Sequence, residues 1–245
     1  MFLPSMEKRL NGNSKMVCMA NRHMAHINWL LYICIGLLCG VSQLHAQRYD
    51  YVYKQLTDSS HHCYVVVIPA NEPIRGLVIR DYSTLPDLRV NKLSAFASMC
   101  AEAGLVTVYT VSSPQFPELF VADSAMDILD DMVAEVKAAY HIPAENIFMG
   151  GISASGTRAL RYAQYCALGK SKHGIRIKGV FVVDAPLDLA RFYTSVYANA
   201  AHFKEGMLWE ATLMQKVFGQ WFGGSPQAFP ATYRSASVFT HGDSM

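Results

Sequence analysis

The sequence has little excess charge of either sign, no internal repeat and no low-complexity block. Its 21 lysines and arginines stand against 19 aspartates and glutamates, so it lacks the basic surplus of a dedicated nucleic-acid surface. With 51% hydrophobic and 16% charged residues, it also lacks the composition of a disordered chain. These absences leave a globular composition whose 245 residues can form one sizeable core.

A hydrophobic run long enough to span a membrane is also missing, because a spanning helix needs roughly 20 apolar residues. The run from Trp29 to Val41 has 13 residues and follows a basic start that includes Lys8 and Arg9. A basic start, a short apolar stretch and a small residue at the cut are typical of a secretory signal. We predict a signal peptide over residues 1–46, cleaved after Ala46, and a secreted or periplasmic protein without a stable membrane span. An uncleaved anchor or a buried helix is the alternative.

Cofactor and metal signatures are absent as well. The chain has neither a G-x-G-x-x-G dinucleotide loop nor a P-loop ending in Gly-Lys-Ser or Gly-Lys-Thr. Cys63, Cys100 and Cys166 are the cysteines after residue 46, an odd number without metal-ligand spacing. Cys100 and Cys166 fall at apolar helix positions and are expected to be buried thiols. We predict neither a metal nor an organic cofactor.

Strand and helix patterns alternate through the middle of the chain. Two apolar runs, 63–68 and 74–79, are joined by a short turn-rich link, which predicts an antiparallel N-terminal hairpin. Further along, apolar spacings of three and four predict helices, and continuous apolar runs predict buried strands. The expected elements are helix 88–103, strand 105–111, helix 121–140, strand 147–149, helix 155–168 and strand 178–183. Their alternation predicts an α/β fold, with a mostly parallel sheet flanked by helices.

After residue 190 the chain becomes aromatic and irregular, without a strong parallel strand. Its aromatic residues include Phe192, Tyr193, Tyr197, Trp209, Trp221 and Phe222. We expect helices over 190–235, forming a cap-like insert within a single domain of residues 47–245.

Functional groups of a parallel sheet lie beyond the C-terminal ends of its strands. Four segments qualify: 81–83, 112–113, 150–155 and 184–188. The segment from Gly150 to Gly156 is the most informative, because Ser153 follows a short strand and precedes an amphipathic helix. A nucleophile on such a tight turn needs small neighbours, here Gly151 and Ser155, and the next backbone N–H, that of Ala154, is placed to stabilise an oxyanion. The alternative is a structural Gly/Ser turn or a phosphate-binding turn.

This segment resembles the nucleophile elbow of the α/β-hydrolase fold, as in secreted esterases and lipases, with G-x-S-x-S in place of G-x-S-x-G. The resemblance covers roughly residues 63–190. It implies a second oxyanion donor just after the third strand, for which the backbone N–H of Tyr82 is the best positional match. It also implies an acid after a late strand, and Asp184 follows the segment that matches the sixth strand. The alternative for Asp184 is a turn in which it caps backbone N–H groups.

The resemblance further implies a catalytic histidine near the end of the fold. His173 precedes a strand, His202 lies in the aromatic insert, and His241 is the remaining candidate base. A complete fold of this kind with a cap needs on the order of 250 residues, and 199 remain after residue 46. We therefore expect that the last two strands are missing and that the chain is C-terminally truncated.

Two functions follow as hypotheses. The first is a secreted serine hydrolase acting on an ester or a related acyl bond of a small molecule or a polymer, incomplete or weakly active as this chain. The second is a non-catalytic binding or carbohydrate-associated surface protein of the same fold, with the aromatic residues from 192 to 222 as its platform. A nonfunctional gene fragment is a third reading. None of them involves nucleic acid.

Overall fold

The computed structural model describes residues 48–53, 63–70, 73–81, 93–113, 123–200 and 205–239. The expected signal peptide, Tyr82, His202 and His241 lie outside these ranges, so the predictions about them remain predictions. No helix in the described ranges is both long and apolar enough to cross a bilayer.

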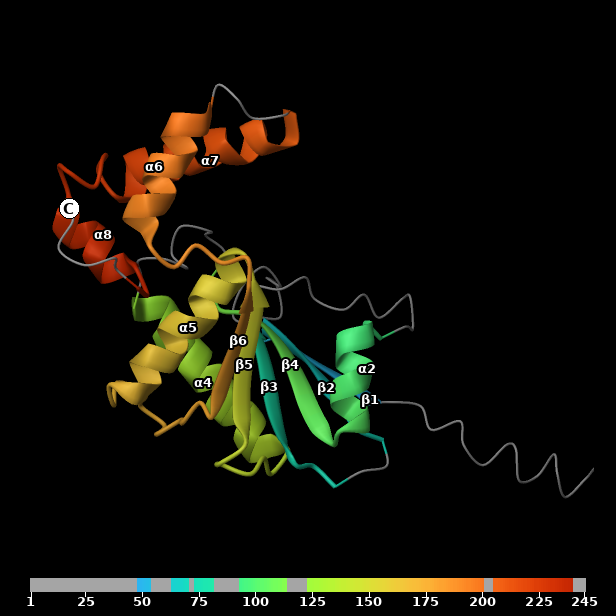
Figure 1. Cartoon of the computed structure of the whole chain (residues 1–245). Coiled ribbons are helices and arrows are strands. Elements are labelled where there is room, and N and C mark those ends of the chain that lie inside the picture. Colours follow the sequence, from blue (N-terminus) through green and yellow to red (C-terminus); the bar gives the residue numbers. More distant parts are fainter. Residues whose placement is uncertain are drawn as a thin grey trace, which may run out of the picture. The chain divides into compact units, whose positions relative to one another are not determined.

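One six-stranded sheet in the order β1-β2-β4-β3-β5-β6 forms the framework (Figure 1). Its strands are β1 (Arg48–Tyr53), β2 (Cys63–Ile68), β3 (Gly76–Asp81), β4 (Leu105–Val111), β5 (Ile147–Ile152) and β6 (Gly179–Val183). β2 pairs antiparallel with both β1 and β4, whereas β4, β3, β5 and β6 run parallel to one another. The predicted mostly parallel α/β sheet flanked by helices is confirmed, and the antiparallel pair at its N-terminal edge consists of β1 and β2.

The predicted pairing of 63–68 with 74–79 is wrong, because β4 lies between β2 and β3. The link between these strands passes the start of β4, where the Arg75 N–H donates to the Gly104 carbonyl oxygen at 2.8 Å. A short link only requires that two strand ends be close. It leaves room for one strand between them, because neighbouring strands are about 4.8 Å apart. The alternating pattern also predicts 105–111, 147–149 and 178–183 as parallel neighbours. β5 and β6 are parallel neighbours, whereas β3 separates β4 from β5.

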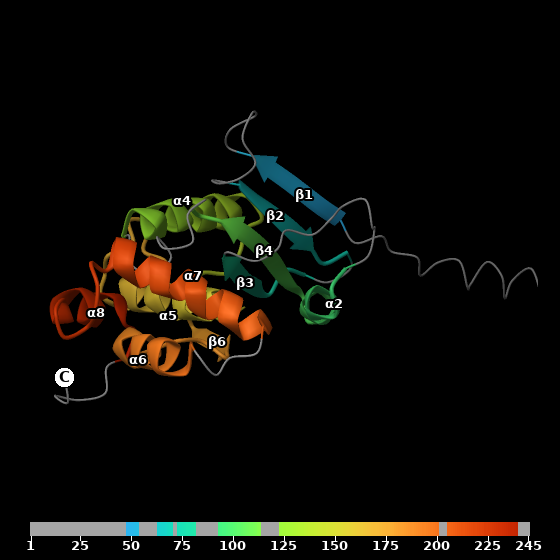
Figure 2. The same ribbon diagram turned by 90° about the horizontal axis from the view of Figure 1, so that it is seen from above.

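Helices cover both faces of the sheet (Figures 1 and 2). α2 (Ala95–Glu102) packs on one face, where Ala97 meets Val67 and Tyr109. α4 (Asp123–Ala139) and α5 (Ala154–Ala167) pack on the other. The three predicted helices correspond to these, but α2 begins later than expected, because the Ser94 side chain caps it by accepting a hydrogen bond from the Ala97 N–H.

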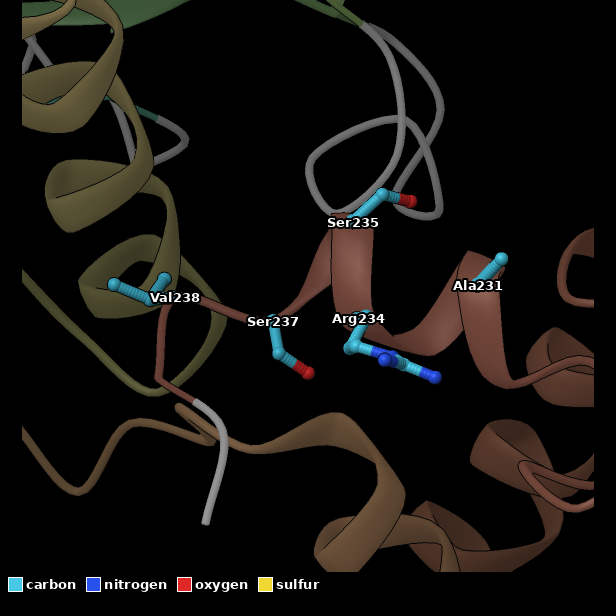
Figure 3. Close-up of a pocket in the computed structure, with 5 residues that line it drawn as sticks. All are labelled: Ala231, Arg234, Ser235, Ser237 and Val238. Carbon is cyan, nitrogen blue, oxygen red and sulfur yellow. The ribbon is translucent and has the colours of Figure 1, made fainter. Parts of the chain in front are cut away.

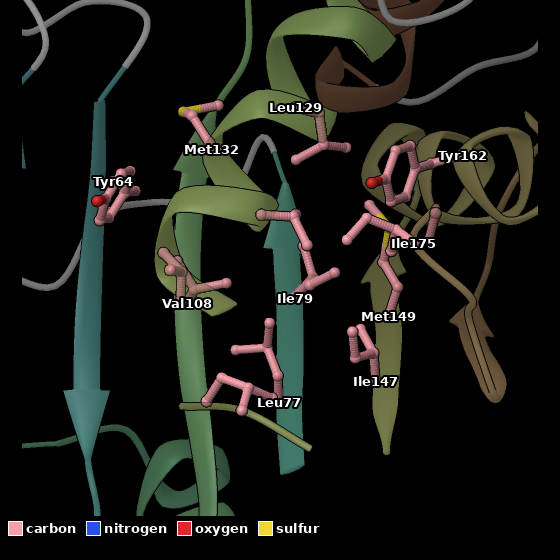
Figure 4. Packing of buried hydrophobic residues seen from close by; sticks show 14 of the residues in the cluster. Tyr64, Leu77, Ile79, Val108, Leu129, Met132, Ile147, Met149, Tyr162 and Ile175 are labelled. Carbon is pink, nitrogen blue, oxygen red and sulfur yellow. The ribbon is translucent and has the colours of Figure 1, made fainter. Parts of the chain in front are cut away.

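The main core lies between the sheet and α4 and α5 (Figure 4). Alternate residues of the central strands point into it, including Ile79 of β3, Val108 of β4 and Met149 of β5, all fully buried. Leu129 and Met132 of α4 close it from the helix side. The core thus supports β5, and the candidate nucleophile directly follows the carboxyl end of that strand.

Three further helices follow β6: α6 (Leu189–Asn199), α7 (Glu205–Trp221) and α8 (Pro230–Ala236). Their apolar faces form a second core that also takes in Ala154, the first residue of α5. The aromatic residues from 192 to 222, the platform of the binding hypothesis, are only partly exposed. Phe222 is buried, and Phe192 and Tyr193 pack against the same cluster, because three short helices need large side chains to form a core.

Candidate active site

Ser153 occupies a strained turn between β5 and α5. Its backbone has φ 55° and ψ −129°, a conformation that a residue with a β-carbon rarely adopts and that costs about 1–3 kcal/mol. Hydrogen bonds hold this conformation on both sides. The Ser153 N–H donates to the Val183 carbonyl oxygen at 2.9 Å, and the Ser153 carbonyl accepts from the Gly156 N–H, also at 2.9 Å.

The hydroxyl of Ser153 is available for chemistry. Ser153 occupies the N-cap position of α5, where a serine hydroxyl ordinarily accepts a hydrogen bond from the first turn. Here the side chain makes no capping hydrogen bond, and the residue is exposed. The turn therefore presents the hydroxyl outward, as a nucleophile elbow requires.

The small residues around Ser153 are required by close packing. A β-carbon on Gly151 would lie 2.3 Å from the carbonyl carbon of Ser155, and one on Gly150 would lie 2.2 Å from the ring of Phe181. Gly156 is equally confined, since its added β-carbon would lie 2.8 Å from that of Ala185. A side chain at Gly151 would therefore force the backbone of the bend to shift, whereas one at Gly150 would displace the Phe181 ring.

Ser155 explains why this motif departs from G-x-S-x-G. Its hydroxyl donates to the Ile152 carbonyl oxygen at 2.8 Å and lies 2.9 Å from the Ile152 N–H, which donates to it. The side chain is buried and folded back onto the turn. Serine at this position therefore fastens the elbow, a role that glycine has no side chain to perform.

The N-terminus of α5 can stabilise an anion. The first backbone N–H groups of a helix have no intrahelical acceptor and lie at the positive end of its dipole. Ala154 is the first residue of α5 and directly follows Ser153, so its N–H lies beside the candidate nucleophile. Tyr82, the expected second donor, is outside the described residues.

Asp184 lies close to the elbow along the backbone. It follows β6 directly, and its neighbour Val183 accepts the hydrogen bond from the Ser153 N–H. Asp184 is exposed with φ 48°, and no hydrogen bond to its carboxylate occurs among the described residues. The capping alternative for Asp184 is wrong: the carboxylate of Asp188 caps α6, accepting from the Ala190 and Arg191 N–H groups at 3.1 and 3.0 Å.

The one expected histidine in the described ranges does not approach Ser153. His173 lies in the link between α5 and β6, at the amino end of β6, and its Nε2 is 2.8 Å from Asp131 Oδ1 of α4. Ser153 lies at the opposite, carboxyl end of the sheet. No catalytic base is therefore placed beside Ser153 within the part of the chain that the structure describes.

The structure also places a residue that the sequence analysis missed. Arg158 of α5 is fully buried and pairs with Asp81 at the carboxyl end of β3. The available signal was spacing: Arg158 falls midway between Ala154 and Tyr162, on the face of α5 that packs inward. A charged residue on that face indicates a buried partner.

The thiols of Cys100 and Cys166 lose their protons only at high pH. Burial raises the pKa of the Cys166 thiol to about 12 and also raises that of Cys100, so both are protonated near neutral pH and neither is an activated nucleophile. Among the described residues, no three His, Cys, Asp or Glu side chains come together as metal ligands.

A cavity of about 700 Å³ is lined by Ala231, Arg234, Ser235, Ser237 and Val238 (Figure 3). Ser153 and Asp184 do not line it.

No family model and no curated protein sequence matches this chain. Among solved structures, the carboxylesterase EstE1 from a metagenomic library is 12% identical over 77% of this chain and 63% of its own, with a TM-score of 0.51. Dipeptidyl peptidase 4 of Porphyromonas gingivalis is 17% identical over 78% of this chain and 25% of its own, with a TM-score of 0.47. A variant of the esterase rPPE is 20% identical over 75% and 59%, with a TM-score of 0.47.

This chain spans less than two thirds of the length of each of these proteins. The identities are too low to carry activity across, so the likeness bears on the fold. The sheet order, the strained serine between β5 and α5 and the likeness to EstE1 agree with one another. The chain has the α/β-hydrolase fold.

Proposed function

We propose that this protein is a serine hydrolase that acts on an ester or a related acyl bond, with Ser153 as its nucleophile. One observation carries the proposal: Ser153 is held at φ 55° between β5 and α5 while its hydroxyl is left out of helix capping. Strain of this kind persists only where the surroundings enforce it, and it clusters at active sites.

The chemistry would proceed in two steps. Ser153 Oγ attacks the carbonyl carbon while its proton passes to a base, and the carbonyl oxygen becomes an oxyanion held by the N–H groups of Ala154 and Tyr82. The oxyanion collapses, the carbon–oxygen bond to the alcohol breaks, and the alcohol leaves with a proton. Water then attacks the acyl-serine, which releases the acid and restores Ser153. Asp184 would orient and stabilise the histidine that serves as base.

The base itself is the incomplete part of this proposal. A serine hydroxyl is a weak nucleophile without one, and His241 is the candidate that the sequence leaves. We propose that the chain is truncated and that the sheet of the full-length protein continues beyond β6. Among the described strands β6 is an edge strand that pairs with β5 on one side, and its other edge supports this continuation. We further propose export, directed by residues 1–46 as a cleaved signal peptide.

A non-catalytic binding protein remains the second candidate. Trp209 is 70% exposed and Trp221 is 38% exposed, both on α7. Exposed aromatic rings of this kind can stack on sugar rings or other flat apolar ligands. This function predicts ligand binding that is lost on Trp209→Ala and unaffected by Ser153→Ala.

Hydrolysis of nitrophenyl acetate tests the catalytic proposal. This activated ester has a good leaving group, so slow acylation of Ser153 is measurable even when the serine is only weakly activated. We expect weak turnover that Ser153→Ala abolishes and His241→Ala barely changes. The matched control is Ser235→Ala, at an exposed serine on α8. Full activity in Ser153→Ala would overturn the proposal, and robust turnover lost in His241→Ala would show that this chain already holds its base.

A further inference from the structure

A buried ion pair joins the helix of the elbow to the centre of the sheet. The Nε atom of Arg158 is 3.1 Å from Oδ2 of Asp81, and both side chains are fully buried. Arg158 lies on α5, the helix that begins at Ala154, and Asp81 is the last residue of β3. The pair therefore connects α5, which has Ser153 as its N-cap, with β3, which lies beside β5 in the sheet.

Ser112 extends this ion pair into a network. Its hydroxyl donates to Asp81 Oδ2 at 2.6 Å, and its backbone N–H donates to Oδ1 at 3.2 Å. Arg158 Nη2 donates to the same hydroxyl at 3.3 Å. Thr110 Oγ1 also donates to Asp81 Oδ1, at 2.8 Å. The carboxyl ends of β3 and β4 are thus bonded to α5 through one carboxylate.

Stability alone does not explain why charges occupy this position. Burying an ion pair costs desolvation energy that its attraction often fails to repay, and apolar pairs of similar volume are commonly as stable or more so. Here one guanidinium nitrogen, Nη1 of Arg158, is buried without a hydrogen-bond partner among the described residues. Unlike an apolar side chain, a guanidinium group makes hydrogen bonds in fixed directions, so it fixes the position of its partners.

The geometry that this network defines is that of the elbow. Other side chains of α5 bond elsewhere, Tyr162 to Asp130 of α4 and Thr157 to the Pro186 carbonyl oxygen. Arg158 joins α5 to the carboxyl ends of β3 and β4 through directional bonds. The Ala154 N–H, one helical turn earlier, follows that placement. Oxyanion donors act only when they lie close to the developing charge, and a displacement near 1 Å can cost about 10²-fold in rate.

We propose that Arg158 and Asp81, braced by Ser112, are positioning residues that set the N-terminus of α5 for oxyanion stabilisation at Ser153. This inference rests on the proposed serine hydrolase function.

The test uses the double variant Asp81→Asn/Arg158→Met, which removes both charges together and leaves neither one buried alone. A fluorophosphonate reagent phosphonylates an active serine: the Oγ–P bond forms, the P–F bond breaks, and fluoride leaves as the serine proton is lost. We expect a thermal midpoint close to that of wild type, an unchanged reversible binding constant and a covalent rate constant lowered by about tenfold or more. A covalent rate equal to that of wild type would overturn the inference.

Ser112→Ala is the milder second variant, and it carries the test if the double variant fails to fold. We expect its covalent rate to fall a few-fold. Asp130→Asn is the matched control, because Asp130 is an equally buried carboxylate of α4 that bonds Ser171 and Tyr162, and Tyr162 lies about two helical turns along α5 from Ala154. Its labelling rate should equal that of wild type, and a loss as large as that of Ser112→Ala would overturn the inference.

Hydrogen–deuterium exchange separates this inference from the proposed function. The peptide containing residues 153–157 should exchange faster in the double variant, or in Ser112→Ala, while α4 exchanges as in wild type. Unchanged exchange at 153–157 would overturn the positioning role. If wild type is not labelled at Ser153, the proposed function fails, and exchange still decides whether the network holds the elbow.

Discussion

The backbone N–H of Ser153 donates to the carbonyl oxygen of Val183 at 2.9 Å, joining the turn after β5 to the end of β6. This bond places the strained serine next to the residue that precedes Asp184. Both Ser153 and Asp184 have positive φ, and both are exposed. The two sequence-predicted site residues are therefore brought together by the backbone of two neighbouring parallel strands.

Gly151→Ala should disrupt the elbow. The added methyl carbon would lie 2.3 Å from the Ser155 carbonyl carbon, so backbone must shift. We expect a loss of about 1–3 kcal/mol in the free energy of unfolding and the loss of Ser153 labelling. Gly219→Ala is the matched control: Gly219 lies in α7 with open space around it, and alanine there should stabilise by about 0.5–1 kcal/mol. Denaturant titration checks both values, and a neutral Gly151→Ala would contradict the prediction.

Ser155→Ala should loosen the turn without removing it. The variant loses the two hydrogen bonds to Ile152 in a buried setting, which should lower the free energy of unfolding by about 1–2 kcal/mol. Ser235→Ala, at an exposed serine, should stay within about 0.5 kcal/mol of wild type. Equal stability of the two variants would show that Ser155 does not fasten the elbow.

Substitutions of Asp184 and of Asp188 should have opposite effects on stability and on the labelling of Ser153. Asp188→Ala removes the N-cap of α6 and should cost about 1 kcal/mol of stability, with Ser153 labelling unchanged. Asp184→Asn should leave stability within about 0.5 kcal/mol and slow the acylation of Ser153. Paired measurements of unfolding and of labelling rate check this contrast. An Asp184→Asn protein that reacts as fast as wild type would remove Asp184 from the site.

Cys166 should be unreactive in the native protein. Burial raises its pKa to about 12, so the folded state holds the thiol proton more tightly than the unfolded state does. Its contribution to stability is present below the ordinary thiol pKa and is lost as pH rises from there towards 12. At pH 8 the thiolate fraction should be about a thousandfold smaller than for a thiol of pKa 9. Iodoacetamide labelling with and without denaturant checks this, and equal rates in both conditions would contradict it.

The parts of the fold that were predicted from sequence depend on local patterns. β4 matches its predicted range, and α5 begins within one residue of the expected start, because a continuous apolar run and a glycine-rich turn each determine a local structure. The elbow was predictable for the same reason. Strand order was not, because a short link constrains only the distance between the ends of β2 and β3, which one strand can separate.

Arg158 was missed for a different reason. An arginine in a helix is ordinarily solvated, and its partner Asp81 is 77 residues away in the sequence, so only the folded sheet brings them together. For the aromatic residues after 190, the sequence could not show which are buried and which are exposed. Phe222 and Trp209 are equally apolar in sequence, but the first is 2% exposed and the second 70%, because only the packing of α6, α7 and α8 separates core from surface.

Site-mapped fluorophosphonate labelling tests the central claim most directly. The intact protein is treated with the reagent, its mass is measured, and the modified peptide is sequenced. We predict a single adduct on Ser153 that forms slowly, because no base lies beside this serine among the described residues. The adduct should be lost in Ser153→Ala and retained in Ser235→Ala. Labelling that persists in Ser153→Ala, or an adduct mapped to another residue, would contradict the assignment of Ser153 as the nucleophile.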